Sequence, residues 1–270
     1  MTKIPLAVRS KILSSYDTFI FDADGVLWLF NKAISGAPEL LNSLIEIGKQ
    51  VIILSNNSTR TIDEYVEKKT MEDAGIEVFG VGADHVEDYT KGNFLTNIDV
   101  SRKVSAVVVS YDIHFNYIKL MRAVNYLKDP NVDFIVTEGD IIVPGPVPDV
   151  ILPCTGWISS AIRTVSGREP FSIGKPNSPV FNYISEKFNI NPKRTLMTGD
   201  SCFSDIPFGN RHGFDTMLVL SGSHSLKDVE KSISEDSMEF VPKMYAPSVK
   251  TLLNDEEIKE ENVVDEISGA

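Results

Sequence analysis

The stretch TFIFDADGV, residues 18–26, places two carboxylates directly behind an apolar run that has the character of a buried strand. Side chains two positions apart on an extended chain point to the same side, so Asp22 and Asp24 are expected to lie together where the strand ends. Gly25 supplies a turn after them. Two carboxylates in a poorly hydrated place repel each other unless one has a raised pKa or a cation binds between them. The stretch therefore predicts a site for a divalent metal ion.

Two other interpretations of this stretch need to be considered. Asp-x-Asp-Gly also begins calcium-binding loops, but a loop counted from Asp22 has Val26 and Ala33 at positions that require oxygen ligands. A calcium loop is therefore excluded. A plain aspartate-rich turn after a strand is common, and other segments of the chain must decide between it and a catalytic site.

The composition is that of an acidic, globular chain of 270 residues, 42% of them apolar, with a formal net charge of −12. The sequence has no stretch rich in Lys and Arg, which argues against nucleic acid and anionic membranes as partners. Cys154 and Cys202 lie far apart without ligands at metal-binding spacing, so neither a zinc site nor a disulfide framework is expected. No apolar run has the length of a membrane span or a signal-peptide core, and a cytoplasmic protein is expected.

Strand-like and helix-like segments alternate along the chain, which predicts an α/β fold with a parallel sheet. After the first strand, further strands are expected at residues 51–54, 106–109, 134–136, 195–198 and, as the last one, 216–220. Helices are expected over residues 36–48, 61–75, 117–127 and 158–165, and from 178 onward. Prolines interrupt residues 143–153, which predicts an irregular loop there.

Polar side chains follow several of these strands, and the carboxyl ends of parallel strands lie along one edge of a sheet. Ser55 and Asn56 follow the second strand, Asp200 follows a later one, and Lys175 stands in a loop that enters a helix. These groups suit metal-assisted phosphoryl transfer, because the transferred group needs its oxygens neutralised by a cation and a lysine. It also needs a nucleophile in line with the leaving group.

Within this hypothesis, Asp22 can attack the phosphorus and Asp24 can transfer protons. Each of the other groups has a plainer explanation when it is taken alone. The serine and asparagine could belong to a helix cap, Lys175 could be a solvated loop lysine, and Asp200 could be a helix N-cap. Their joint occurrence in this order favours the catalytic interpretation. Asp205 stays open between support of a metal site and the start of a helix.

Six segments match a known family in the family's order and cover most of the chain: FIFDADGVLW (19–28), GKQVIILSNNST (48–59), GVGADHVEDY (80–89), VVVSYDIHFNYIKLMRAVNYL (107–127), SIGKPNSPVFNYI (172–184) and RTLMTGDSCFSDIPFGNRHGFDTMLVLSG (194–222). On these residues the chain resembles the haloacid dehalogenase superfamily of phosphohydrolases. It resembles more closely the branch of 4-nitrophenylphosphatases, phosphoglycolate phosphatases and the pyridoxal phosphatase chronophin.

The resemblance implies a doubly wound, Rossmann-like core of parallel strands in the order 3-2-1-4-5. An α/β cap domain is inserted into such a core after its third strand. The implied domains are residues 1–81 for the first part of the core, 82–171 for the cap and 172–270 for the second part of the core.

The resemblance also implies roles for the acidic residues. Asp22 is expected to become an aspartyl-phosphate, and Asp24 to protonate the leaving alkoxide and then to activate water. Mg²⁺ is the implied cofactor, held by Asp22, the backbone carbonyl of Asp24 and Asp200, with Asp205 supporting its ligand shell. The chain departs from the family between Asp200 and Asp205, where Ser-Cys-Phe-Ser replaces the usual Arg-Leu-x-Thr.

The remaining implied roles concern the phosphoryl group. Ser55 and the backbone of Asn56 are expected to bind its oxygens, and Asn57 to face the substrate. Lys175 is expected to neutralise the phosphoryl charge and to orient Asp22.

The expected activity is therefore Mg²⁺-dependent hydrolysis of small phosphate monoesters, such as phosphoglycolate, glycerol phosphate, pyridoxal phosphate or 4-nitrophenyl phosphate. One alternative is a phosphoprotein phosphatase, which a covered site disfavours because it admits small molecules more readily than a folded protein. The other is a shortened, non-catalytic variant that acts as a binding or dimerisation partner.

One departure from the family concerns the core itself. Residues 76–79, IEVF, run straight into residues 80–82, GVG, where the family has a helix, the third core strand and another helix. About one βα unit, on the order of 30 residues, has no counterpart, so the third core strand is expected to be missing. The strand at residues 50–54 then becomes an apolar, uncharged sheet edge, through which a homodimer or aggregate is expected to form unless residues 75–81 cover it.

Overall fold

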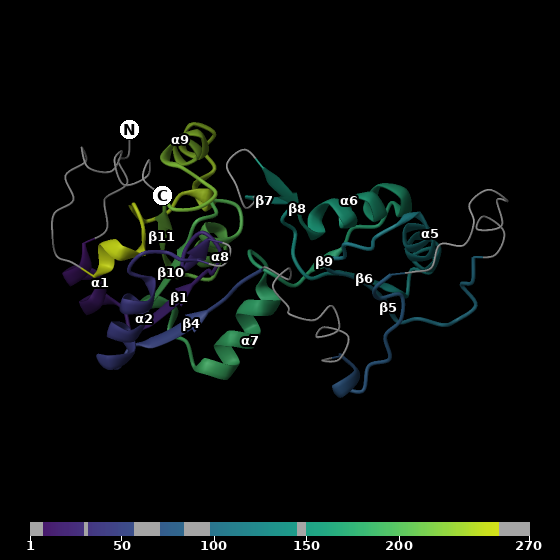
Figure 1. Ribbon diagram of the computed structural model, residues 1–270, viewed down its shortest axis with the longest axis horizontal. Coiled ribbons are helices and arrows are strands. Elements are labelled where there is room, and N and C mark those ends of the chain that lie inside the picture. Colours follow the sequence, from purple (N-terminus) through teal and green to yellow (C-terminus); the bar gives the residue numbers. More distant parts are fainter. Residues whose placement is uncertain (1–7, 30–31, 57–70, 84–97, 145–149, 254–270) are drawn as a thin grey trace. The chain divides into compact units, whose positions relative to one another are not determined.

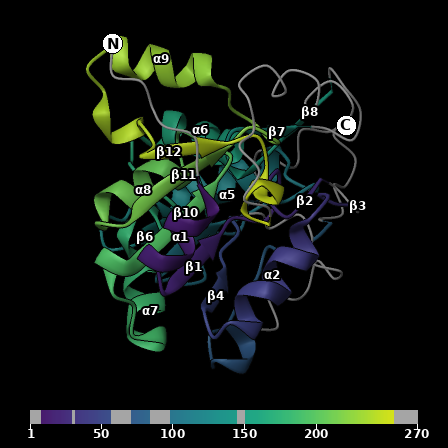
Figure 2. The same cartoon turned by 90° about the vertical axis from the view of Figure 1, so that its left-hand side faces the viewer.

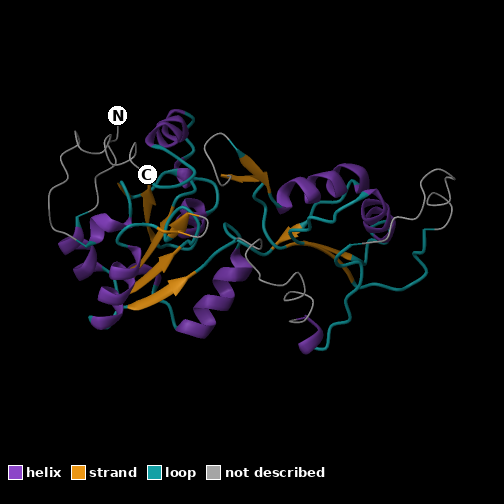
Figure 3. Ribbon diagram, viewed as in Figure 1, coloured by secondary structure: helices purple, strands orange, loops and turns teal. Residues whose placement is uncertain are grey.

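The computed structural model describes residues 8–29, 32–56, 71–83, 98–144 and 150–253, in which strands and helices alternate along the chain (Figures 1 and 3). These described residues fall into two compact units. The chain passes from the first unit to the second after Asn56, the first unit also includes the stretch Pro144–Val150, and the first unit resumes at Lys175. The α/β fold predicted from the sequence is confirmed.

The first unit contains a five-stranded sheet with the order β12-β11-β10-β1-β4, in which all neighbouring strands are parallel. Its strands are β1 (Thr18–Phe21), β4 (Gln50–Ile53), β10 (Thr195–Gly199), β11 (Asp215–Val219) and β12 (Met244–Ala246). Because β1 lies between β10 and β4, the carboxyl ends of these strands are neighbours on one edge of the sheet. The predicted strand ends are therefore brought together.

Helices cover both faces of this sheet (Figure 2). Phe19 and Phe21 of β1 pack on one side, with α1 (Arg9–Ser15), α2 (Ala37–Glu46) and the 3-10 helix η4 (Val249–Leu252). Ile20 packs on the other side, with α7 (Ser178–Phe188) and α8 (Asp205–Arg211). All side chains of β1 are buried, as expected for the central strand of a doubly wound sheet.

The remaining elements of the first unit continue this arrangement. Val229 of α9 (Leu226–Ser234) packs with Ile206 of α8 and Leu218 of β11. Two short 3-10 helices, η2 (Pro192–Arg194) and η3 (Met238–Phe240), precede β10 and β12. A small antiparallel hairpin of β2 (Trp28–Leu29) and β3 (Lys32–Ala33) follows the loop after β1.

The second unit contains a three-stranded parallel sheet in the order β5-β6-β9. Its strands are β5 (Ala106–Val109), β6 (Asp133–Val136) and β9 (Phe171–Ser172), and its helices are α5 (Tyr117–Tyr126) and α6 (Thr155–Ser166). Phe134 and Val136 of the sheet form a core with Ile158 and Ile162 of α6. The sequence predicts a cap domain over residues 82–171, and that this unit acts as a cap stays a prediction.

Two expectations about strands need correction. The stretch 143–153 is not wholly irregular, because β7 (Ile142–Pro144) and β8 (Ile151–Pro153) pair into a two-stranded sheet. Each strand ends on its proline, and proline is tolerated at sheet edges and strand ends. The strand near residue 216 is also not the last one, since β12 follows it. A three-residue strand is too short to show a periodic pattern in the sequence.

β4 is the terminal strand of the five-stranded sheet in the part of the chain that the structure describes. That the core lacks a third strand beside it stays a prediction. Ile53 of β4 is 48% exposed, whereas Ile52 is 7% exposed and packs toward α7. Among the described residues, none of the helices combines the length and the apolar character that crossing a membrane requires.

Candidate active site

Asp22 lies where β1 ends, as the sequence predicts. Its backbone N–H donates to the carbonyl oxygen of Thr198 in β10 at 2.9 Å, so the residue continues the ladder between the two strands. Asp22 is only 9% exposed. A carboxylate that is held at a strand end in this way has little freedom to reach water on its own and needs charged partners.

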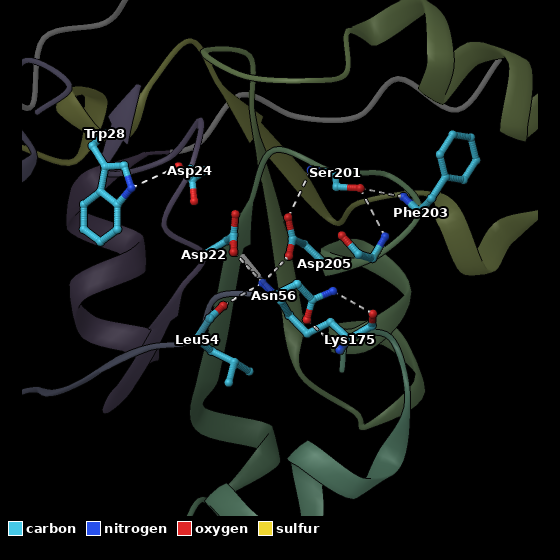
Figure 4. Close-up of polar contacts among 10 residues, drawn as sticks. Asp22, Asp24, Trp28, Leu54, Asn56, Lys175, Ser201, Phe203 and Asp205 are labelled. Carbon is cyan, nitrogen blue, oxygen red and sulfur yellow. Dashed lines mark hydrogen bonds and ion pairs between the residues drawn. The ribbon is translucent and has the colours of Figure 1, made fainter. Parts of the chain in front are cut away.

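Lys175 is the cationic partner of this carboxylate. The residue is 2% exposed, and its Nζ contacts Asp22 Oδ1 at 2.6 Å and Asp205 Oδ1 at 2.8 Å (Figure 4). The same ammonium donates to the carbonyl oxygen of Leu54 at 2.6 Å, directly after β4. Since an ammonium has three hydrogens to donate, these contacts occupy Lys175 fully. The alternative of a solvated loop lysine is excluded.

Asp200 and Asp205 bring two further acids to the same place. Asp205 is 1% exposed, begins α8 and accepts a hydrogen bond from the backbone N–H of Ser201 at 3.0 Å. Asp200 is 5% exposed and accepts from the backbone N–H of Ser223 at 2.7 Å. Asp205 is thus both the start of a helix and a member of the charged cluster, and its support of a metal site stays a prediction.

Glycines make the close approach of these acids possible. A Cβ atom at Gly25 would lie 2.3 Å from Asp200 Oδ2, and one at Gly222 would lie 2.0 Å from the same oxygen. A Cβ atom at Gly199 would lie 2.1 Å from the Cβ of Asp205. Backbone therefore fits against both carboxylates at positions where any side chain would displace them.

The pKa values of the cluster reflect burial and mutual charge. Burial raises the pKa of Asp22 well above its usual range, against the opposing charge of Lys175, and the charges of Asp205 and Asp200 raise it further. Burial, together with the charge of Asp205, raises the pKa of Asp200 to about 7. Burial lowers the pKa of Lys175, but the carboxylates of Asp205 and Asp22 outweigh it and raise that pKa above its ordinary value. Lys175 therefore stays protonated.

The acids fit a bound divalent cation. Asp22, Asp200 and Asp205 each offer a carboxylate oxygen, and these oxygens lie within 4.8 Å of one another. Carboxylate oxygens are the ligands that Mg²⁺ prefers in proteins. Since Lys175 supplies a single positive charge against these acids, a second cation would relieve the repulsion that raises their pKa values. The cluster can thus hold a metal ion.

Asp24 lies beside this cluster in the turn that follows β1 and is half-buried. The indole Nε1 of Trp28 donates to Asp24 Oδ1 at 3.1 Å (Figure 4). This contact was not predicted from the sequence, although Trp28 stands in the segment that carries the family resemblance. The contact was missed because a tryptophan at this place is equally well explained as an apolar residue of the core.

The side chain of Asn56 makes two hydrogen bonds to the backbone of Lys175. Its Nδ2 donates to the carbonyl oxygen of Lys175, and its Oδ1 accepts from the backbone N–H of Lys175, both at 2.9 Å. This reciprocal pair fixes the backbone that carries the buried ammonium. Ser55 is exposed at the end of β4, where a hydroxyl can meet a ligand. Asn57 lies outside the described residues.

The arrangement joins a buried carboxylate, a protonated lysine, a possible cation site and a second carboxylate in an adjoining turn. A negatively charged group such as a phosphate would be attracted to the lysine and to a cation bound by the acids, and the carboxylate of Asp22 could act as a nucleophile beside them. Asp24 can give or take a proton. This set of groups is suited to phosphoryl transfer.

Comparisons with known proteins agree with this geometry. The sequence model for haloacid dehalogenase-like hydrolases matches residues 19–86, and a model for HAD-hydrolase-like proteins matches residues 172–252. The matched ranges contain every residue of the charged cluster described above.

Several relatives extend over nearly the whole chain. Glycerol-3-phosphate phosphatase of Rattus norvegicus is 32% identical over 301 aligned positions, covering 92% of this chain and 93% of that protein. Chronophin of Homo sapiens is 32% identical, covering 91% of this chain and 95% of that protein. Because the alignment of 301 positions exceeds the chain's 270 residues, the rat protein has segments without a counterpart here.

Another relative is longer, and solved structures share the fold. The putative NipSnap protein K02D10.1 of Caenorhabditis elegans is 38% identical over 76% of this chain, which spans only 48% of that protein. The crystal structure of 4-nitrophenylphosphatase from Thermotoga maritima superposes with a TM-score of 0.66 at 25% identity, covering 92% of this chain and 99% of that one. From these relatives and the geometry of its site, the chain belongs to the family of haloacid dehalogenase-like hydrolases and is a phosphoric monoester hydrolase of the chronophin and glycerol-3-phosphate phosphatase type.

Proposed function

We propose that this phosphatase hydrolyses small phosphate monoesters with the help of Mg²⁺, through a phosphoaspartyl intermediate on Asp22. The observation that carries the proposal is the buried contact of Asp22 with Lys175 at 2.6 Å, next to Asp200 and Asp205. Burial of a nucleophile beside a fixed cation is the arrangement that an anionic substrate requires.

In the first step, a carboxylate oxygen of Asp22 attacks the phosphorus and the bond between phosphorus and the ester oxygen breaks. Asp24 gives its proton to the departing oxygen, so that the alcohol leaves in neutral form. Lys175 holds Asp22 in place and offsets negative charge on the phosphoryl oxygens, for which Ser55 and the backbone of Asn56 supply hydrogen bonds. Asn57 is assigned to the substrate side of the site.

In the second step, water attacks the phosphorus and Asp24 takes a proton from it. The bond between phosphorus and Asp22 then breaks, which releases inorganic phosphate and restores both carboxyl groups to their starting states.

The proposed metal ligands are the carboxylates of Asp22 and Asp200 and the backbone carbonyl of Asp24, with Asp205 supporting them. A bound Mg²⁺ supplies positive charge that neutralises the phosphoryl oxygens and lowers the repulsion between the acids. Burial of Asp200, which raises its pKa to about 7, supports this assignment, because a cation nearby would favour the charged form that burial disfavours.

Small esters are the proposed substrates because relatives of this chain carry such names, among them glycerol-3-phosphate phosphatase and 4-nitrophenylphosphatase. Phosphoglycolate, glycerol phosphate, pyridoxal phosphate and 4-nitrophenyl phosphate are the candidates. A homodimer and a cap formed by the second unit are further parts of this proposal.

The test is a panel of these esters, assayed for phosphate release with Mg²⁺ and with a chelator. We expect turnover of at least one ester that requires Mg²⁺ and that Asp22→Asn abolishes, since the amide cannot form the acyl phosphate. Asp73→Asn makes the same change at an exposed site and should leave turnover unchanged. Hydrolysis that survives Asp22→Asn in folded protein would refute the proposed nucleophile.

A further inference from the structure

The turn after β1 is closed by Trp28 through both backbone and side chain. The backbone N–H of Trp28 donates to the carbonyl oxygen of Ala23 at 3.1 Å, and the backbone N–H of Gly25 donates to the carbonyl oxygen of Trp28 at 2.8 Å. The indole Nε1 reaches back across this turn to Asp24 Oδ1 at 3.1 Å. Asp24 therefore lies inside a loop whose ends are fastened to one residue.

The position of the indole is set by its surroundings and not by Asp24 alone. Trp28 packs against the core cluster that contains Val26 and Leu27, and its backbone pairs with Ala33 in the β2–β3 hairpin. Val26 and Leu27 are almost fully buried. A donor fixed in this way can impose one orientation on a half-buried carboxyl group, because the carboxyl must turn to meet it.

A carboxyl group that accepts a hydrogen bond from a fixed N–H does so best through its carbonyl-like oxygen. When Asp24 is protonated, the indole N–H therefore favours Oδ1 as the acceptor and the proton is carried by Oδ2. The transfer of a proton is efficient only when the donor atom lies within hydrogen-bond reach of the departing oxygen. Which oxygen carries the proton is thus part of the site's geometry.

We infer that Trp28 is a positioning residue for the phosphatase reaction: its indole holds Asp24 Oδ1, so that Oδ2 delivers the proton to the leaving oxygen as the phosphorus–oxygen ester bond breaks. The inference rests on the proposed role of Asp24 as the general acid. It adds a residue that takes no part in the chemistry itself and acts through Asp24.

The inference is tested with two esters of similar shape, phenyl phosphate and 4-nitrophenyl phosphate. Phenolate is the more basic leaving group and needs the proton more, because the nitro group stabilises the negative charge of 4-nitrophenolate. Trp28→Phe keeps a ring in the core and removes the N–H. We expect its kcat/KM to fall about 10-fold on phenyl phosphate and less than about 2-fold on 4-nitrophenyl phosphate, in line with the loss of one hydrogen bond to the protonated, neutral carboxyl group.

Three further variants keep the test decisive. Trp157→Phe makes the same change at the chain's other tryptophan and should affect both esters equally, whatever the size of its effect. Asp24→Asn should show a larger preference for 4-nitrophenyl phosphate than Trp28→Phe does. Asp24→Asn combined with Trp28→Phe should lose no more on phenyl phosphate than Asp24→Asn alone, because both changes act on one proton transfer.

The outcomes separate the inference from the proposal on which it depends. If Asp24→Asn favours the nitrophenyl ester but Trp28→Phe lowers both esters equally, Trp28 is merely structural and the inference is wrong. The inference is also wrong if the loss of kcat/KM on phenyl phosphate in the double variant equals the product of the two single losses. If Asp24→Asn itself shows no preference between the esters, the proposed general acid is wrong and the inference falls with it.

Discussion

At the scale of single residues, the site gathers charges that a protein interior normally excludes. Asp22, Asp205 and Lys175 are all nearly buried, and the two carboxylates are tolerated because each contacts the ammonium of Lys175. Removing one partner from such a set costs more than the contact itself, because the remaining charges stay buried without compensation. Substitutions here should therefore change stability as well as activity, and activity must be compared between folded variants.

Gly25 is the residue where backbone conformation and the charged cluster meet. Its φ is +79°, in the left-handed region, and a Cβ atom there would lie 2.3 Å from Asp200 Oδ2. Gly25→Ala should therefore cost about 1–2 kcal/mol for the backbone and also displace Asp200. We expect kcat/KM on 4-nitrophenyl phosphate to fall by about 10-fold or more, since small misplacements at a reacting centre are costly.

Gly48→Ala is the matched control for this prediction. Gly48 has a similar φ of +77°, but a Cβ atom there meets nothing within 4 Å. This variant should lose a comparable amount of stability in urea denaturation and keep its activity. If both glycine variants lose activity to the same degree, the effect comes from the backbone and the contact with Asp200 is unimportant.

At the scale of elements, the sequence was sufficient where a pattern extends over several residues. The apolar runs of β1, β4 and β10 and the amphipathic pattern of α2 predict these elements, because burial on one or both faces dictates the residue types. β12 could not be predicted from three residues. A strand of that length is defined by its pairing with β11, which is a long-range property.

The same distinction holds for the site. The ends of β1 and β10 predict that Asp22 and Asp200 meet, since the topology of a parallel sheet brings neighbouring strand ends to one edge. Lys175 lies in a loop before α7, and its place beside them was inferred from the residue types and not from a strand end. The side-chain contact between Asn56 and the backbone of Lys175 depends on the path of a loop and on one rotamer, for which the sequence has no periodic signal. The contact of Trp28 with Asp24 was missed for the same reason.

A prediction at the scale of elements concerns hydrogen exchange of the backbone amides of β4. Gln50 and Leu54 donate their backbone N–H groups to Asp17 and Phe21 on the β1 side. Because residues alternate along a strand, Val51 and Ile53 direct their N–H groups to the outer side, where the described part of the chain has no further strand. Hydrogen exchange should therefore be slow at Ile52 and Leu54 and faster by about 10-fold or more at Val51 and Ile53.

Repeating the hydrogen-exchange measurement at several protein concentrations tests whether the edge of β4 pairs with a second chain. An unpaired apolar edge favours pairing with a second chain, so the amides of Val51 and Ile53 should become protected as the protein concentration rises. The amides of Ile52 and Leu54 should not change, since they already bond to β1. Equal, strong protection of all four amides in a dilute monomer would show that the edge is covered and that the prediction is wrong.

At the scale of the whole molecule, the net charge of −12 and the acidic cluster both destabilise the folded state. Excess negative charge disfavours the compact state through repulsion, and the buried acids concentrate part of that repulsion in one place. The stability of the metal-free protein should therefore depend on pH in a way that the cluster determines. A cation in the site should reverse this dependence.

The sign follows from the raised pKa values of Asp22 and Asp200. An aspartate in the unfolded chain has a pKa of about 3.9, whereas burial and the charge of Asp205 raise the pKa of folded Asp200 to about 7. Between these values the folded state binds more protons than the unfolded state, so the free energy of unfolding decreases as pH rises. The stabilisation that protonation provides is present below about pH 4 and is lost as pH passes through 7.

Thermal denaturation between pH 5 and 8 tests this dependence, once in EDTA and once in excess Mg²⁺. In EDTA the Tm should fall as pH rises, by about 2–4 °C for each kcal/mol of lost stability in a chain of this size. Mg²⁺ should raise the Tm more at pH 8 than at pH 5, because the metal binds the ionised acids and protons compete with it at low pH. Asp200→Asn removes one titrating group and should flatten the profile in EDTA, while Asp73→Asn, at an exposed site, should leave it unchanged. A Tm that rises with pH in EDTA would show that the raised pKa values do not control the stability of the metal-free protein. An equal effect of Mg²⁺ at both pH values would show that the cluster is not the metal site that its geometry indicates.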